Sequence, residues 1–184
     1  MSNFIKQNNM DYRNGTYVAF DGNGQDDPTK GDLKYLGILR AWKESDNIDF
    51  NFTDSHKKTY QVRDSSSEAT LKSRLEDRMR LSKNMLVIIS DDTNYDRGLL
   101  NWEIQTAQEK YGLPIIVAYA GEHYLPWLTD ELIEKLPMAI WRDVKFGGNH
   151  YSHIPFTKDR IMRAINHYSV VSGVYPNSEK EIFF

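Results

Sequence analysis

The chain contains no cysteine among its 184 residues. This absence excludes disulfides, thiolate nucleophiles and cysteine-ligated metal sites. No apolar run approaches the roughly 20 residues that a helix needs to cross a membrane. The first residues also lack the apolar stretch of a secretory signal. Together these absences predict a cytoplasmic protein with no membrane-spanning segment.

The chain also lacks a large excess of charge of either sign. It carries 23 basic and 26 acidic residues, which gives a formal net charge of −3. Non-specific nucleic-acid binding is driven by cationic surface, so we expect neither a nucleic-acid nor a membrane partner. No internal repeat or low-complexity tract is visible. The length and the hydrophobic content of 40% suit one domain with a full-sized core.

Short apolar runs alternate with amphipathic stretches along most of the chain. The runs predict strands at Thr16–Phe20, Ile48–Thr53, Asn84–Ser90, Leu113–Ala120 and Met138–Trp141. The amphipathic stretches predict helices at Leu33–Glu44, from the capping box Ser65-x-x-Glu68 onward, at Asn94–Tyr111, around Trp127–Lys135 and after Thr157. This order predicts an α/β fold, a doubly wound, mostly parallel five-stranded flavodoxin-like sheet with strand order 2-1-3-4-5.

The composition divides the chain into three parts. Residues 1–15 form a polar, Asn-rich arm, residues 16–171 the domain, and residues 172–184 a C-terminal tail that either docks on the domain or stays loose. A long polar loop, Asp54–Asp64, follows the second predicted strand. Such loops are often functional.

A glutamate in the third predicted helix is the main candidate for chemistry. The helix buries a stripe made of Leu100, Ile104, Ala107 and Tyr111. Glu103 borders this stripe in the first turns, near the carboxyl end of the preceding strand. Open α/β sheets bind their ligands at that edge. A lone glutamate is more often a solvated helix residue, so the assignment needs support from the rest of the chain.

Two other motifs do not predict a site of their own. Asp21-Gly22-Asn23-Gly24 resembles the opening of a dinucleotide-binding loop, but Asp27 stands where the third glycine belongs and nearby acids would repel a pyrophosphate. The segment is therefore interpreted as a turn at the end of the first strand. His150 and His153 have no third partner, and catalytic zinc needs three protein ligands, so we predict no metal site.

Four segments resemble a known family. They are TYVAFDG, LRAWKESDNIDFNFTDSHK, RDSSSEATLKSRLEDRMRLSKNMLVIISDDT and LLNWEIQTAQEKYGLPIIVAYA. They resemble the bacterial TIR-like family, in particular the TIR proteins of Thoeris anti-phage systems, the ThsB type. The resemblance covers roughly residues 15 to 170. Its most specific part is the WEI of the third helix, between an apolar strand and a GLPIIV strand.

The resemblance implies an activity and a site. Catalytic TIR domains cleave NAD with a glutamate in that helix, which here is Glu103. Their pocket lies at the end of the first strand, the loop after the second strand and the start of the third helix. The matching positions are Phe20, Asp21, Asp54 and Trp102. In the Thoeris setting, NAD⁺ is the substrate rather than a cofactor, and the product is a cyclic ADP-ribose isomer that activates a separate effector protein.

The chemistry needs only one carboxylate. Hydrolysis of a glycosidic bond usually takes two, one of which protonates the leaving group. The nicotinamide of NAD⁺ is already cationic and leaves as a neutral molecule, so a single carboxylate can stabilise the oxocarbenium-like ribose. An internal nucleophile would give a cyclised product, and water would give ADP-ribose.

Two alternatives remain open on the sequence. One is a nucleoside deoxyribosyltransferase-like enzyme, which also uses a glutamate on a related scaffold. The other is a non-enzymatic TIR adaptor that only assembles with partners. TIR enzymes that resemble this chain often need self-association or a trigger, so we expect weak activity from the isolated protein. We also expect Glu103→Gln to leave folding nearly unchanged, because a charge bordering the stripe contributes little to stability.

Overall fold

The computed structural model describes residues 12–21, 33–45, 52–54, 68–91, 93 and 98–184. Within these ranges the chain forms one parallel sheet with the strand order β2-β1-β3-β4-β5-β6. The strands are β1 (Gly15–Ala19), β2 (Phe52–Asp54), β3 (Ser82–Ile89), β4 (Ile115–Tyr119), β5 (Tyr151–Pro155) and β6 (Glu181–Ile182). The helices are α2 (Leu33–Ser45), α3 (Glu68–Arg80), α4 (Gly98–Glu109), α5 (Asp130–Glu134), α6 (Met138–Phe146) and α7 (Lys158–His167).

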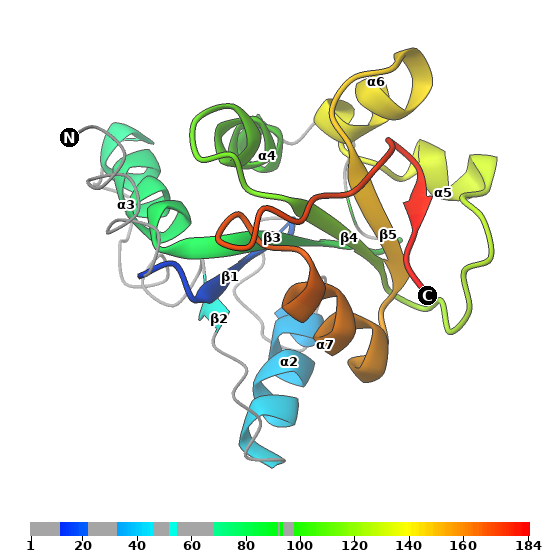
Figure 1. Ribbon diagram of the computed structural model, residues 1–184, viewed down its shortest axis with the longest axis horizontal. Coiled ribbons are helices and arrows are strands. Elements are labelled where there is room, and N and C mark those ends of the chain that lie inside the picture. Colours follow the sequence, from blue (N-terminus) through cyan, green and yellow to red (C-terminus); the bar gives the residue numbers. More distant parts are fainter. Residues whose placement is uncertain (1–11, 22–32, 46–51, 55–67, 92, 94–97) are drawn as a thin grey trace.

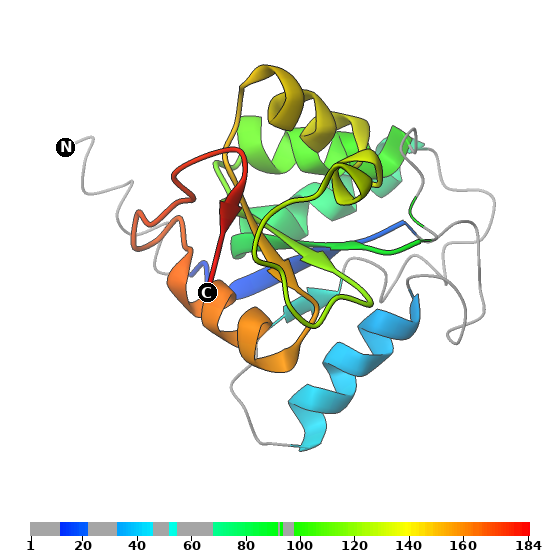
Figure 2. The same ribbon diagram turned by 90° about the vertical axis from the view of Figure 1, so that its right-hand side faces the viewer.

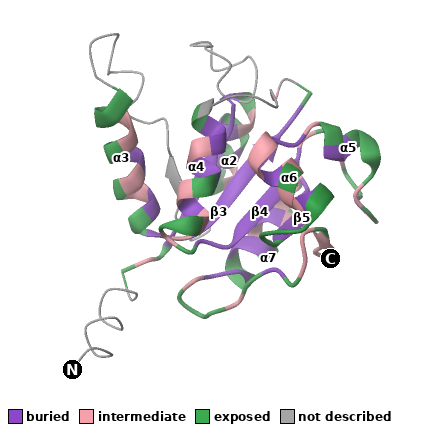
Figure 3. Cartoon of the chain, turned by 90° about the horizontal axis from the view of Figure 1, so that it is seen from above, coloured by how far each residue is buried: buried purple, intermediate pink, exposed green. Residues whose placement is uncertain are grey.

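Helices cover both faces of the sheet, with α3, α4 and α6 on one side and α2 and α7 on the other (Figures 1 and 2). Alternate residues of each strand enter the two cores. In β1, Tyr17 and Ala19 belong to the core under α3 and α4, whereas Val18 belongs to the core under α2 and α7. The central strands are therefore buried on both faces (Figure 3), as parallel strands usually are. The doubly wound α/β prediction is confirmed.

The predicted fifth strand is wrong. Residues 138–141 begin helix α6, and the fifth strand is β5, for which the sequence predicted no strand. A four-residue apolar run does not distinguish a strand from a buried helix turn. Ile140 and Val144 are buried one helical turn apart, which suits a helix. The sequence did not predict β5 because the buried residues of this strand include the polar Ser152 and His153, which interrupt the apolar run expected of a buried strand.

A sixth strand corrects the predicted strand count. The end of the C-terminal tail pairs in parallel with β5, with Ser152 opposite Glu181 and His153 opposite Ile182. The tail therefore docks on the domain and extends the sheet (Figure 2). The remaining predicted strands fall within two residues of β1, β3 and β4, and part of the second one lies outside the described residues. No helix in the described ranges is long and apolar enough to cross a membrane.

Candidate active site

Helix α4 carries Glu103 over the sheet. Glu103 is the sixth residue of α4, so it lies within the first two turns, as predicted. Leu100 and Ile104 on the same helix are buried in the core over β1 and β3. The Glu103 side chain is only 2% exposed, so it belongs to the buried face rather than to its border. Its role in catalysis stays a prediction.

The carboxyl group of Glu103 is bonded to the first strand. The Tyr17 hydroxyl donates a hydrogen bond to Glu103 Oε1, and both side chains are buried. Tyr17 is the central residue of β1, so this bond holds Glu103 over the middle of that strand. Sequence reasoning missed Tyr17. The signal was its place on the α4-facing side of β1, because a buried tyrosine hydroxyl usually needs a partner.

Burial sets the charge of Glu103. Loss of contact with water raises the pKa of Glu103 to about 7. The Tyr17 hydrogen bond and the nearby Arg78 guanidinium of α3 act in the opposite direction, and the value of about 7 already includes their lowering effect. At neutral pH the acid and the carboxylate are therefore both populated. Carboxyl groups with such a pKa are typical of functional sites.

Two other predicted site residues, Asp21 and Asp54, lie toward the carboxyl ends of β1 and β2. Asp21 lies two residues after the end of β1 and is 4% exposed. Asp54 is the last residue of β2, and its backbone is in register with Val18 of β1. The predicted loop beyond Asp54, residues 55–64, lies outside the described residues. The fold thus places both positions toward the carboxyl ends of two neighbouring strands.

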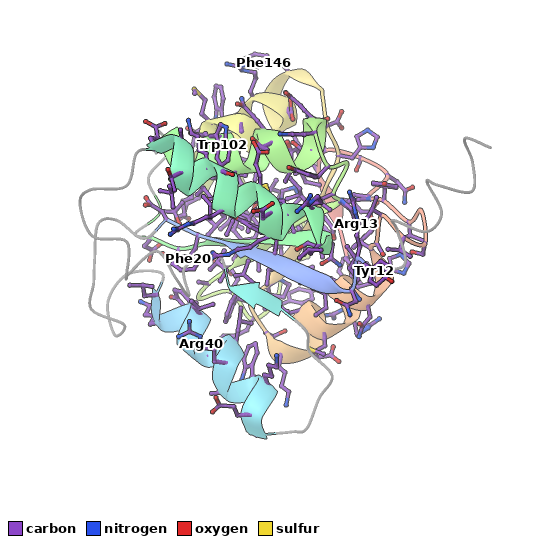
Figure 4. All side chains as sticks on the ribbon, turned by 90° about the vertical axis from the view of Figure 1, so that its left-hand side faces the viewer. Tyr12, Arg13, Phe20, Arg40, Trp102 and Phe146 are labelled. Atoms are coloured by element: carbon purple, nitrogen blue, oxygen red, sulfur yellow. The ribbon has the colours of Figure 1, made fainter. Side chains whose placement is uncertain are left out.

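Phe20 is not brought together with Glu103. Its side chain is 2% exposed and packs with Leu33 and Leu36 of α2, in the core on the opposite face of the sheet. Figure 4 shows Phe20 on the α2 side of the sheet and Trp102 on the α3 side. A ligand could therefore contact Phe20 only through its backbone atoms.

Trp102 lies on the α3 side of α4. It is half-buried against the core that contains Leu75 and Met79 of α3. The ammonium of Lys72 stands 5.2 Å from the centre of a Trp102 ring, within the range of a cation–π contact. Lys72 also pairs with Glu68 at 2.6 Å. One face of the indole therefore already holds a cation.

Two polar contacts fix the surroundings of α4. Asn101 Oδ1 accepts a hydrogen bond of 2.9 Å from the backbone N–H of Ala139, which joins α4 to the start of α6. Lys135 Nζ donates to Asp91 Oδ1 at 2.8 Å, which joins the end of α5 to the residue after Ser90. Asn101 is a second residue that sequence reasoning missed, because its partner lies 38 positions away.

The sequence of this region matches a protein family. Residues 17–123 match the family model described as Thoeris protein ThsB, TIR-like domain. The match spans more than half of the 184 residues. The chain belongs to this family. The matched range includes the end of β1, all of β2, β3 and β4, and all five residues predicted for the site. The resemblance to ThsB-type TIR proteins is thereby confirmed.

His150 and His153, the pair considered for a metal site, have structural partners. Nε2 of His153 lies 2.9 Å from the Glu179 carbonyl, to which it donates, so Nδ1 accepts the Tyr119 hydroxyl at 2.8 Å. His150 Nδ1 lies 3.2 Å from the Pro176 carbonyl. In the described part of the chain, no three His, Asp or Glu side chains gather in a geometry that suits a metal ion.

Two open clefts in the described part of the chain lie away from Glu103. One, of about 340 Å³, includes Gly112, Pro114 and His150, which precede β4 and β5. The other, of about 440 Å³, includes Arg13, Lys83 and Ser169. Both lie at the amino edge of the sheet, opposite the edge where open α/β folds bind ligands. The buried carboxyl group of Glu103 lies on α4, the helix that follows the carboxyl end of β3, and is therefore the better candidate for chemistry.

Proposed function

We propose that this ThsB-type TIR-like domain cleaves NAD⁺ at its nicotinamide glycosidic bond, with Glu103 as the catalytic residue. The observation that carries the proposal is a buried carboxyl group, bonded to β1, inside a family of TIR-like domains. The product is proposed to be a cyclic ADP-ribose isomer that activates a separate effector of anti-phage defence.

The reaction follows from the charge of the substrate. The bond between the ribose C1′ and the nicotinamide nitrogen breaks, and its electron pair returns to the pyridinium ring, which leaves neutral. Positive charge then develops on the ribose, where the Glu103 carboxylate stabilises it. A nucleophilic atom of the same molecule, either an adenine nitrogen or a ribose hydroxyl oxygen, attacks C1′ and this new bond closes the ring. A hydroxyl nucleophile releases its proton to solvent. Because the leaving group needs no proton, the proposed reaction uses NAD⁺ as substrate with no further cofactor.

The raised pKa of Glu103 fits this role. Only the carboxylate stabilises a cation, and a pKa raised to about 7 keeps this form accessible near neutral pH. A bound pyridinium ring is an opposite charge, which favours the ionised form. Binding of NAD⁺ would therefore increase the charged fraction when it is needed.

The remaining predicted residues are proposed to bind the substrate. Asp21 and Asp54 stand at neighbouring strand ends, where carboxylates can accept hydrogen bonds from ribose hydroxyls. Phe20 would contribute through its backbone, because its side chain is in the core. Trp102 is proposed to border the nicotinamide, since indole faces attract cations.

A comparison of Glu103→Gln with Glu109→Gln tests the proposal. Glu109 is an exposed carboxylate on the same helix, so it controls for loss of charge alone. Wild type and both variants are expressed in cells under phage infection, and nicotinamide and cyclised nucleotides are measured by mass spectrometry. We expect Glu103→Gln to reduce both products roughly 10²–10³-fold, the usual effect of losing one preorganised group. Glu109→Gln should match wild type.

Other outcomes identify the alternatives. Full turnover by Glu103→Gln would remove Glu103 as the catalyst. Purely linear ADP-ribose from wild type would leave NAD⁺ cleavage in place but remove the cyclic signal. Release of free base from deoxynucleosides would indicate a deoxyribosyltransferase-like enzyme, and absence of any turnover under infection would indicate an adaptor.

A further inference from the structure

The contact between Tyr17 and Glu103 joins two elements far apart in sequence. The two residues are 86 positions apart, and their hydrogen bond connects the centre of β1 to the first turns of α4. The Tyr17 ring is fully buried among the core residues under α3 and α4. Its hydroxyl is therefore held in a fixed place, whereas the Glu103 side chain has three rotatable bonds.

We propose that Tyr17 is a positioning residue, whose hydroxyl holds Glu103 Oε1 so that the other carboxylate oxygen faces the ribose of the substrate. This inference rests on the proposed function of Glu103. Supporting groups of this kind fix the orientation of a reactive side chain, and a loose site loses rate even when its catalytic group is present.

The cost of burying Glu103 argues against a purely structural pair. Tyr151 and Tyr168 also donate to carboxylates, but their partners Asp143 and Glu181 keep contact with solvent. Glu103, in contrast, is almost fully removed from water. A buried carboxyl group is unfavourable unless it is well paired, and a neutral acceptor would satisfy a tyrosine hydroxyl at lower cost. The chain nevertheless places an ionisable group there.

Two basic residues of α3 act on this part of α4. Arg78 of α3 acts on Glu103 through its charge. Lys72, also of α3, stands over the ring of the adjacent Trp102. From β1, Tyr17 supplies the hydrogen bond, which lowers the pKa of Glu103 more than Arg78 does. Removing the Tyr17 hydroxyl should therefore have the larger effect on the charge of Glu103.

The test uses Tyr17→Phe in the full chain, with Tyr151→Phe as the matched control. Both variants keep a buried aromatic ring and remove one hydroxyl that donates to a carboxylate. The Glu103 carboxyl is titrated by ¹³C NMR without NAD⁺, and NAD⁺ turnover is measured against pH under infection-triggered conditions. Tyr17→Phe should titrate Glu103 about one pH unit higher, which lowers kcat about tenfold below neutral pH. KM should change little, and Tyr151→Phe should shift neither measurement.

A second substitution covers the case in which Tyr17→Phe folds poorly. Fluorotyrosine at position 17 retains the ring and makes the hydroxyl a stronger donor, so the acid limb of the pH profile should move to lower pH. Unchanged Glu103 titration and pH profile in Tyr17→Phe, or no opposite shift with fluorotyrosine, would overturn the positioning role. Because the titration needs no turnover, it separates this failure from a failure of Glu103 as the catalyst.

Discussion

Residue by residue, the position of Glu103 was predicted more accurately than its environment. The helical stripe placed it at the border of the buried face, where a charge would stay solvated. In the structure Glu103 is 2% exposed, because α3 lies beside α4 and the Tyr17 side chain of β1 contacts its carboxyl group. The expectation that Glu103→Gln leaves folding nearly unchanged therefore rested on a wrong premise. A buried carboxyl group couples stability to pH.

The free energy of unfolding of Glu103→Gln, minus that of wild type, should be larger at high pH than at low pH. The pKa of Glu103 is about 7 in the folded chain, against an ordinary value near 4.5. Between these values the folded state keeps a proton that the unfolded state releases, so wild type loses stability as pH rises. The protonated acid contributes its full stabilisation below pH 4.5. This contribution decreases as the pH rises and is gone above pH 7. The glutamine does not titrate.

The size of this effect is at most about 3 kcal/mol. Urea unfolding of both proteins at pH 5 and pH 8 measures it, with Glu109→Gln as the exposed control on the same helix. The difference in free energy of unfolding, variant minus wild type, should grow with pH. Two parallel pH curves would mean that Glu103 titrates at its ordinary pKa and is not buried in solution.

Among the elements, the docking of α7 depends on a buried amide in β3. Asn84 Nδ2 donates to the carbonyl oxygens of Ile165 and Tyr168, at 2.8 Å and 2.6 Å. Both carbonyls lie at the C-terminal end of α7, where helix carbonyls lack partners within the helix. Sequence periodicity predicted the strand and the helix. It carries no information on this contact, whose partners are more than 80 positions apart.

Asn84→Ala should destabilise the domain by about 2–3 kcal/mol, because two buried carbonyl oxygens lose their donor. Asn166→Ala is the matched control, since Asn166 is exposed on α7 and alanine suits a helix interior. The urea midpoint should fall for the first variant and stay equal or rise slightly for the second. Equal midpoints for Asn84→Ala and wild type would remove Asn84 as the anchor of α7.

For the whole molecule, the C-terminal residues close one edge of the sheet. β6 covers β5, where Phe183 N–H donates to the His153 carbonyl at 3.3 Å. The Phe183 ring packs on Tyr168 at 5.3 Å, and Arg163 donates to the Phe184 carbonyl at 2.7 Å. Without this segment, β5 would present unpaired backbone groups to another chain.

Deletion of residues 179–184 should therefore lower stability and promote self-association. Loss of the Phe183 packing alone removes about 1.5–3 kcal/mol. Light scattering after size-exclusion chromatography should show concentration-dependent dimers of the shortened chain. Lys180→Ala, an exposed change within the segment, is the control and should behave as wild type. A deletion variant that stays as stable and as monomeric as wild type would show that β6 does not protect the edge.

The sequence by itself determined the fold class, the order of the first four strands and the place of Glu103 near the start of α4, because local periodicity marks the elements and the doubly wound topology orders them. Its TIR resemblance also identified the family. Tertiary structure alone decided that Met138–Trp141 is helical, that β5 buries His153, and that Tyr17 bonds Glu103. Each depends on partners distant in sequence. A polar residue can be buried only where another segment supplies its hydrogen bond, and local pattern does not contain that partner.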